Sequence, residues 1–525
     1  MGAKMFGELT KTSSRIAIAA ALGMTLGGFA MSASPAKAAD LGGDCCADLE
    51  ERVAELEATT VRKGNKKVSV TLSGWVVKLG SWWDDGHESN FYVGDKDTTL
   101  SSHFQISGSA QIAPGWSAGY TMAVEVMGTS CSVGFAENQF NDNVCVTPGG
   151  GGSSLDIFGN INTLLSYMWI KSDKWGTINW GQLSQATDNV ALLPDLSGTV
   201  IESNAVVFDG SGMRVRTKGA KNSNELASDF NWGGALSCLG IGFGIGADCN
   251  GYPENAIRYD SPTLAGFSMS TSYGEDDMWD IALKYAADWN SVKVSAAAGY
   301  TQLTDEGCLT PGCTRVPVVG GGGHPQQGFR KDTDIWQVGA SVMHVPSGLW
   351  AYGMWEQEEN KGTQFVHPNF KNGGLTNSAA NENETWFVKA GIKKTWMPVG
   401  ATVVWGEWGQ YNDMFSGLCN FQGNPCFPIP TNIQYGNGVP LSEDAYITGS
   451  QVTRWGIGVV QEIDSAAMHV FARWQRLSLD LDATSTGLFR PVNVAICFEN
   501  GRFGKKVSTS FEDLDIFQIG GVIFF

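Results

Sequence analysis

The chain ends in DLDIFQIGGVIFF, Asp513 to Phe525, and this stretch decides the fold. At a period of two residues, Phe517, Ile519 and Phe525 fall on one face of a strand, and Gln518 falls on the other. In water, a strand this apolar would be an exposed edge prone to pair with other chains. Either a buried sandwich core or a membrane barrel, with lipid outside and a lumen inside, would accommodate it. The rest of the sequence favours the barrel, which we expect the last strand, ending at Phe525, to close by pairing with the first.

Length and composition favour many short strands. The chain has 525 residues, with 67 Gly, 19 Trp and only 17% charged residues. Beyond the first forty or so positions the sequence has no apolar run of about 18 residues, so we expect no transmembrane helix in the mature chain. Glycine- and aromatic-rich segments with an alternating pattern are typical of strands. The formal net charge of −18 argues against a nucleic-acid partner.

The first 38 residues have the features of a secretory signal peptide. A positively charged lead precedes an apolar core at Ile16–Met31, and Ala36-Lys37-Ala38 offers a cleavage site between small residues. A retained membrane anchor is the alternative, and Pro35 with its small neighbours argues against it. We therefore expect residues 1–38 to direct export to the bacterial outer membrane.

A short polar segment, residues 39–66, separates the leader from the strands. Within it, residues 46–60 predict a helix, because apolar residues recur at a four-then-three spacing between Glu and Arg. Two readings stay open: a homo-oligomeric coiled coil at the periplasmic end of the barrel, and a single helix packed on the barrel mouth. Adjacent Cys45 and Cys46 would be placed to cross-link subunits in the first case.

The chain contains 11 cysteines, a number that fits export to an oxidising compartment. Eight of them form four close pairs in stretches rich in Gly, Asn and Pro. No pair has CxxC spacing or a histidine at metal-ligand spacing, so we expect no metal, and no cofactor is indicated. Beyond the cross-link that a coiled coil would allow for Cys45 and Cys46, the sequence assigns no role to these two or to Cys497. The candidate disulfides join Cys131 with Cys145, Cys238 with Cys249, Cys308 with Cys313, and Cys419 with Cys426.

From residue 67 to residue 525 the pattern alternates with a period of two. In KVSVTLSGWV, for example, Val68, Val70 and Leu72 fall on one face of the strand, and serine and threonine fall on the other. Each such segment has about ten residues, the span of a tilted membrane strand. Counting the final strand gives sixteen, an even number. The sequence therefore predicts an all-β, 16-stranded antiparallel transmembrane β-barrel.

The connections between these strands alternate in length. Short turns such as Pro114-Gly115 and Met397-Pro398 alternate with long segments, the longest of which is 184–254. Short periplasmic turns and long extracellular loops are typical of outer-membrane barrels. Tryptophans near the strand ends are consistent with aromatic girdles at the two membrane interfaces, and the partner of the outer surface would be outer-membrane lipid.

The third long loop, residues 184–254, is the candidate constriction of the lumen. Sixteen strands enclose a bore that wall side chains do not fill, so another segment must narrow it. The loop carries Asp188, Asp195 and Glu202 on an apolar frame. Such a frame would pack inside the barrel while the carboxylates face water; an exposed surface flap is the alternative.

The wall opposite the loop is expected to be basic. Seven cations fall on the inward phase of their strands, and cations that face acids across a narrow gap would set up a transverse field and tune ion preference. They are Arg258, Lys284, Lys293, Lys389, Lys393, Arg454 and Arg473.

Several stretches resemble the general porin family of alphaproteobacteria. They are DLEERVAELEATTVRKGNKKVSVTLSGWV from Asp48, RYDSPTLAGFSMSTSYGEDD from Arg258, WGQLS from Trp180, and the terminal Phe525. The resemblance implies a homotrimer in which the third loop folds into the pore, and passive diffusion of ions and small hydrophilic solutes. It also implies that the three loop acids line the eyelet. The many loop cysteines and the long third loop depart from the simplest members of that family.

The sequence also bears on three functions other than a diffusion channel. The six histidines are scattered without a Ser-His-acid grouping, so we do not expect an enzyme. A non-conducting structural or adhesive barrel remains an alternative, distinguished by conductance. A channel specific for sugars or anions is another, distinguished by saturable flux.

Overall fold

The computed structural model describes most of the chain after residue 67. The described residues are 68–96, 100–126, 161–206, 213, 215–216, 218, 232–233, 235–236, 238, 246–250, 253–306, 331–361, 365–366, 375–376, 382–414, 427–435, 439–491, 498–499, 505–507 and 510–525. The expected signal peptide (1–38) and the helix expected at 46–60 lie outside them.

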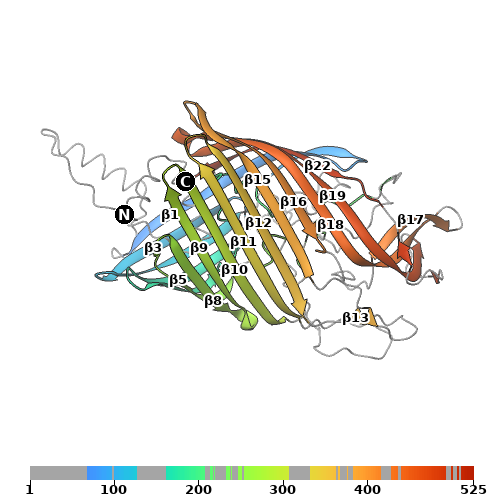
Figure 1. Ribbon diagram of the computed structural model, residues 1–525, viewed down its shortest axis with the longest axis horizontal. Coiled ribbons are helices and arrows are strands. Elements are labelled where there is room, and N and C mark those ends of the chain that lie inside the picture. Colours follow the sequence, from blue (N-terminus) through green and yellow to red (C-terminus); the bar gives the residue numbers. More distant parts are fainter. Residues whose placement is uncertain are drawn as a thin grey trace.

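Sixteen strands form a closed antiparallel barrel, as the sequence predicts (Figure 1). In chain order they are β1 (Ser69–Asp84), β3 (His103–Ala113), β4 (Trp116–Val126), β5 (Ile161–Ser172), β6 (Gly176–Leu183), β7 (Glu254–Asp260), β8 (Phe267–Gly274), β9 (Trp279–Trp289), β10 (Val292–Glu306), β11 (Lys331–His344), β12 (Leu349–Lys361), β15 (Glu382–Met397), β16 (Gly400–Asn412), β18 (Val439–Ile463), β19 (Met468–Pro491) and β22 (Leu514–Phe524). Each strand pairs with the next in this order.

The barrel closes where the last strand meets the first. β22 pairs antiparallel with β1, with Phe524 opposite Trp75 and Asp515 opposite Asp84. Beyond the strand end, the N–H of Gly74 donates to the carbonyl of Phe525 over 2.9 Å, and the N–H of Phe525 donates back over 3.1 Å. Backbone groups in lipid must be hydrogen-bonded within the protein, and this seam meets that demand.

Shorter elements lie outside the sixteen barrel strands, and some of them extend the barrel sheet. They are β2 (Ser89–Gly94), β13 (Phe365–Val366), β14 (Leu375–Thr376), β17 (Phe427–Tyr435), β20 (Phe498–Glu499), β21 (Lys506–Val507) and the 3-10 turns η3 (Glu275–Asp277) and η4 (Asp464–Ala466). β17 pairs with β18, and β20 and β21 pair with β19. β13 and β17 lie at the end of the molecule away from the C-terminus (Figure 1). Within the described part of the chain, no helix is long and apolar enough to cross a membrane.

The two ends of the barrel differ in their connections, as expected. At one end the strands are joined by the short turns 114–115, 173–175, 261–266, 290–291, 345–348, 398–399 and 464–467. At the other end the connections are long, apart from residues 275–278 between β8 and β9, and the longest runs from 184 to 253. This is the loop asymmetry of an outer-membrane barrel.

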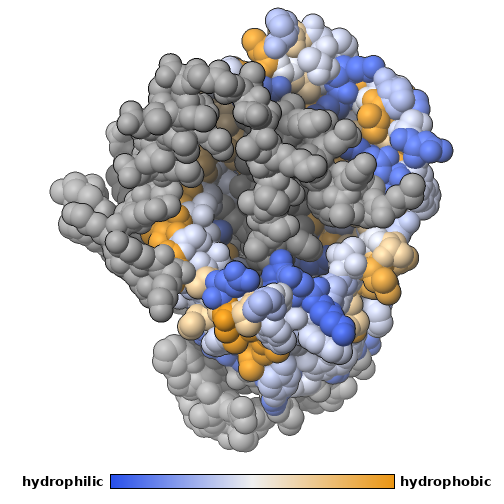
Figure 2. Space-filling view, turned by 90° about the vertical axis from the view of Figure 1, so that its left-hand side faces the viewer, coloured by the Kyte–Doolittle hydropathy of each residue, from blue (hydrophilic) through white to orange (hydrophobic). Residues whose placement is uncertain are grey.

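The outer face of the barrel is apolar. On β22, Phe517, Ile519 and Ile523 are 42–54% exposed, whereas Ile516 and Val522, on the opposite phase, are buried. Figure 2, which views the left-hand side of Figure 1, shows small apolar patches beside hydrophilic ones on that face. Four exposed tryptophans gather at the short-turn end, as an aromatic girdle would: Trp116, Trp175, Trp289 and Trp396.

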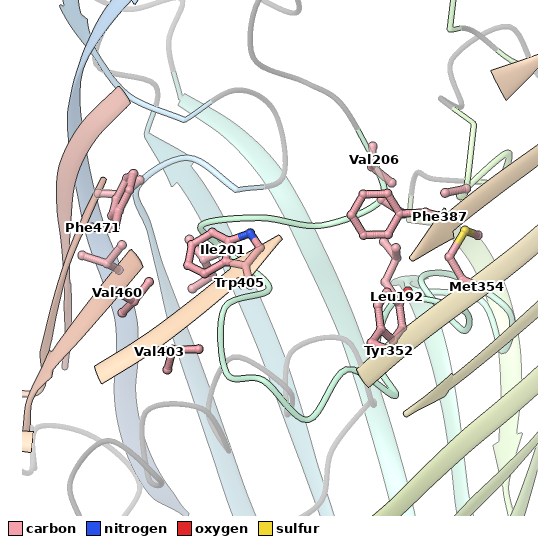
Figure 3. Packing of buried hydrophobic residues seen from close by; sticks show 14 of the residues in the cluster. Leu192, Ile201, Val206, Tyr352, Met354, Phe387, Val403, Trp405, Val460 and Phe471 are labelled. Atoms are coloured by element: carbon pink, nitrogen blue, oxygen red, sulfur yellow. The ribbon is translucent and has the colours of Figure 1, made fainter. Parts of the chain in front are cut away.

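The described residues of the third loop, which spans 184–253, pack on the inner face of the barrel. Its Leu192, Ile201 and Val206 join a buried apolar cluster with Phe387 and Trp405, which point inward from β15 and β16 (Figure 3). Later parts of the loop enter two further clusters of inward-facing wall residues. The loop therefore supplies the core that wall side chains alone do not make.

The apolar exterior makes a testable prediction. Ile457→Lys places a charge on the outer face of β18, where the side chain is 60% exposed. In lipid this substitution should cost about 2–4 kcal/mol, because the ammonium replaces an apolar group in the hydrocarbon band. Urea unfolding of protein refolded into lipid vesicles measures the cost.

Leu264→Lys is the matched control for that substitution. Leu264 is apolar and 79% exposed, but it lies in the turn between β7 and β8, at the short-turn end of the barrel, and not on a strand. Its replacement should leave the unfolding midpoint unchanged. Equal losses for the two variants would contradict a lipid-facing exterior.

Candidate functional site

The first part of the third loop lies against a wall of small residues. Gly339 on β11 allows this close approach, because a Cβ there would stand 2.0 Å from the carbonyl oxygen of Ala191. The hydroxyl of Tyr352 donates to that same oxygen over 2.8 Å, and Ser341 Oγ donates to the carbonyl of Pro194 over 2.5 Å. The loop backbone is therefore fixed directly to β11 and β12.

Thr187 anchors the start of the loop. Its N–H and its hydroxyl both lie 2.8 Å from Oδ2 of Asp280 on β9, and Thr301 on β10 lies 2.6 Å from the same hydroxyl. Ala186 N–H donates to Ser272 Oγ on β8 over 3.0 Å. All of these groups are buried. A hydrogen-bonded buried carboxylate thus holds the loop where it leaves the wall.

Asp188 lies in the same region. Asn189 donates a side-chain N–H to it over 2.7 Å, and the charges of Arg258 and Lys284 act on it. Burial raises the pKa of Asp188 to about 6, although a hydrogen bond from Ser184 and the two cations oppose the rise. Arg258 also donates to the carbonyl of Ser184 over 2.6 Å, which ties the loop to β7.

Lys389 on β15 is the main cationic anchor of the loop. Its Nζ lies 2.7 Å from a carboxylate oxygen of Asp195, and both side chains are almost fully buried. The same nitrogen donates to Thr199 Oγ1 over 2.9 Å and to the carbonyl of Ser203 over 2.7 Å. One ammonium group therefore binds the loop at three residues, Asp195, Thr199 and Ser203.

Further along, β16 and β18 continue this attachment. Arg454 donates to Glu407 Oε1 through Nη2 over 2.7 Å and through Nε over 3.1 Å, both groups buried. Ser203 Oγ donates to the same carboxylate, and Tyr411 donates its hydroxyl to the carbonyl of Ala205. The loop is thereby bonded to wall residues that are themselves paired.

β19 and β15 supply the last contacts of this part of the loop. His469 Nδ1 lies 2.6 Å from Glu202 Oε1, and Arg473 donates to the carbonyl of Glu202 over 2.7 Å. Lys393 Nζ lies 3.4 Å from the carbonyl of Ser197. Lys293, by contrast, is half-buried near the short-turn end of β10.

These contacts differ from the expected arrangement of charges. We expected the loop carboxylates to face water and the wall cations across a gap. In the structure Asp188, Asp195 and Glu202 are 3%, 8% and 1% exposed, and the last two touch basic side chains directly. The reason is the apolar frame of the loop. Leu192 and Ile201 pack against apolar side chains of the wall, and this brings the acids within hydrogen-bonding distance of basic wall residues. The charges anchor the loop.

Several residues of this network were not singled out from the sequence. Glu407, Tyr411 and Asp280 lie inward on strands, and His469 precedes Arg473 by four residues on the same face. Their polar side chains on the inward phase of a strand could have indicated them. The sequence-based prediction considered only the cations on that phase, although anions on the same phase are the partners of those cations.

The second part of the loop contains a disulfide between Cys238 and Cys249, with Cα atoms 5.4 Å apart. Ala247 and Cys249 donate backbone N–H groups to Glu356 on β12 over 3.0 and 3.1 Å, and Gln337 donates over 2.8 Å. The two sulfurs lie near Glu356 but are bonded to each other, so they offer no thiolate to a metal. The remaining candidates, Cys131, Cys145, Cys308, Cys313, Cys419 and Cys426, lie outside the described residues, as do Cys45, Cys46 and Cys497.

A closed barrel with a lipid-facing exterior and a charged loop folded into its lumen defines an outer-membrane channel. The model of the Gram-negative porin family matches residues 17–467, and the chain belongs to this family. It is thus a porin of the outer membrane. A search of the curated proteins finds no match.

Solved structures of outer-membrane proteins are similar to the chain at low identity. OmpT of Vibrio cholerae, folded in vitro, is 10% identical with a TM-score of 0.42, covering 89% of this chain and 99% of that one. OmpF of Salmonella typhi in complex with daunomycin is 12% identical with a TM-score of 0.41, covering 89% and 100%. OprB of Pseudomonas putida is 9% identical with a TM-score of 0.43, covering 91% and 97%.

The Asp195–Lys389 pair gives a prediction about stability. Asp195→Asn leaves the Lys389 ammonium buried without its counter-charge, and Lys389→Met leaves the carboxylate alone. Each single change should cost about 3–5 kcal/mol, and the double variant should cost less than the sum of the two. Urea unfolding in lipid vesicles measures the coupling.

The surface pair of Lys506 and Asp482 is the control, since its side chains are 71% and 60% exposed. Lys506→Met should change stability little. If the losses of unfolding free energy in the Asp195 and Lys389 single variants simply add in the double variant, the two groups do not stabilise one another.

Proposed function

We propose that this porin is a general diffusion channel for ions and small hydrophilic solutes, with the third loop setting its aperture. The observation that carries the proposal is the attachment of residues 186–205 to the inner wall, from β8 to β19, by buried hydrogen bonds and ion pairs. A sixteen-stranded barrel is wide enough to hold such a loop and still leave a path for water. Solutes cross down their gradients in this scheme, without a catalytic step.

The charges of the site would set ion preference. Asp188, Asp195 and Glu202 on the loop, with the inward cations of the wall other than Lys293, place both signs of charge at the constriction. Because Asp195 is paired with Lys389, neutralising the acid leaves a positive charge beside the aperture. The pairs thus balance the field that passing ions meet.

A homotrimer is part of the proposal. β6, β7 and β8 have only eight, seven and eight residues, whereas β18 has 25. Seven residues of a tilted strand rise roughly 16 Å, less than an apolar band about 25 Å tall. Ile257 and Tyr273 on this low wall are 60% and 58% exposed. A second copy packed there would shield a wall too short for lipid, and the segment 46–60 would add a coiled coil.

Recording in planar bilayers tests the function. Purified protein should give stable ohmic steps, which close in threes if each unit is a trimer. Under a salt gradient, Asp195→Asn should move the reversal potential toward anions, while the exposed Glu382→Gln should not. Absence of stable steps would contradict the channel and favour a structural or adhesive barrel. Flux that saturates and is blocked by a single sugar or anion would replace a general channel by a specific one.

A further inference from the structure

The contact between Glu202 and His469 stands out among the anchors of the third loop. His469 Nδ1 and Glu202 Oε1 are 2.6 Å apart, and the side chains are 2% and 1% exposed. His469 lies on β19, two residues before the inward-facing Phe471, and its ring meets that of Phe524 edge-on at 5.0 Å. The pair is therefore enclosed between the loop and the seam of the barrel.

Other charged groups surround this contact. Arg473 on β19 bonds the backbone carbonyl of Glu202, and Lys96, which follows β2, acts on the carboxylate. Glu462 on β18 and Lys393 on β15 act on the imidazole from the other side, and these two form an ion pair of their own at 2.5 Å. The paired charges of Glu462 and Lys393 largely offset each other at His469, so Glu202 is its main partner.

Glu202 keeps its charge over the range in which an imidazole titrates. Burial raises the pKa of this carboxyl, but the attraction and the hydrogen bond of His469 outweigh burial, so the pKa lies below its ordinary value. An imidazole loses its proton near neutral pH, with an ordinary pKa of about 6.5. The pair therefore has two states: charged on both sides in acid, and charged on Glu202 alone in alkali.

The other cations that bind this part of the loop are lysine and arginine side chains. Lys389 holds Asp195 and Ser203, and Arg473 holds the carbonyl of Glu202. Lysine and arginine side chains are ordinarily charged throughout the range from about pH 5 to pH 9. Among these described cations that bind the loop, His469 is thus the one with an ordinary pKa near neutrality.

We propose that Glu202 and His469 form a pH-responsive latch on the third loop, and that loss of the imidazole proton releases residues 202–206 into the lumen and narrows the channel. The wall behind this stretch is occupied by packed side chains, Phe471 and Trp405 among them, so a released stretch moves away from the wall. The latch rests on the proposed function, because it regulates the aperture assigned to this loop.

The direction of the pH effect follows from the charges. In acid, imidazolium and carboxylate attract one another in a buried site where the attraction is poorly screened. In alkali the hydrogen bond remains, but Glu202 is left as a buried anion without the charge of its main partner. The channel is therefore steady in acid and closes more often in alkali.

Single-channel recording at about pH 5 and about pH 9 tests the latch. For the wild type, the fraction of time spent in closed or partly closed levels should rise about tenfold from the lower to the higher pH, as expected for one lost ionic contact. His469→Gln, which bears no charge at either pH, should show the high closed fraction at both. Glu202→Gln should abolish the rise of the closed fraction in alkali, because no buried carboxylate is left without a partner charge when the imidazole loses its proton. This second variant decides the question if His469→Gln does not fold.

His344→Gln is the matched control. His344 is exposed at the end of β11, where it bonds Ser347, and its replacement should leave the wild-type pH response intact. A closed fraction that is the same at both pH values, or a His469→Gln channel that still responds like the wild type, would overturn the latch. A wild-type protein without stable steps at any pH would instead overturn the proposed function.

Discussion

The ammonium group of Lys389 is the interaction on which the interior of this porin depends. It lies 2.7 Å from Asp195, bonds Thr199 and the carbonyl of Ser203, and sits within 6 Å of the rings of Trp350 and Trp405. A buried charge is costly unless its partners are complete, and here the loop supplies them. Wall and loop therefore depend on each other. The loop supplies the hydrogen-bond and ion-pair partners of the Lys389 ammonium, and the ammonium fixes the position of this part of the loop in the lumen.

The inner wall has small residues on one side and large side chains on the other, and this difference explains how closely the loop approaches it. On β10, Gly299 leaves room for the side chains of Thr187 and Val190, and on β11, Gly339 leaves room for the loop backbone at Ala191. On β12 to β19, aromatic and charged side chains reach out to it instead. The loop can therefore follow the inner wall closely on one side and stand away from it on the other. A barrel of sixteen strands needs such a filler, because its own side chains do not meet across the lumen.

Much of this fold could be predicted from the sequence, and the site could be predicted only in part. Period-two alternation fixed the strands, and the phase of Phe517 and Ile519 gave the lipid face, because both signals are local. The inward position of Arg454 follows from the same phase. Its pairing with Glu407, and that of Glu202 with His469, could not be predicted, since each depends on how strands far apart in sequence face the folded loop. The expectation that the acids face water was wrong for the same reason.

Hydrogen exchange of the folded protein, followed by mass spectrometry, tests most directly whether the third loop is fixed to the inner wall. Between residues 187 and 203, backbone N–H groups such as those of Thr187, Leu193 and Ser203 are bonded within the loop or to the wall. The loop should therefore exchange as slowly as strand β16, with opening free energies close to that of the barrel. Exchange of residues 187–203 at the rate of a solvated loop would contradict the account, whatever the conductance of the channel.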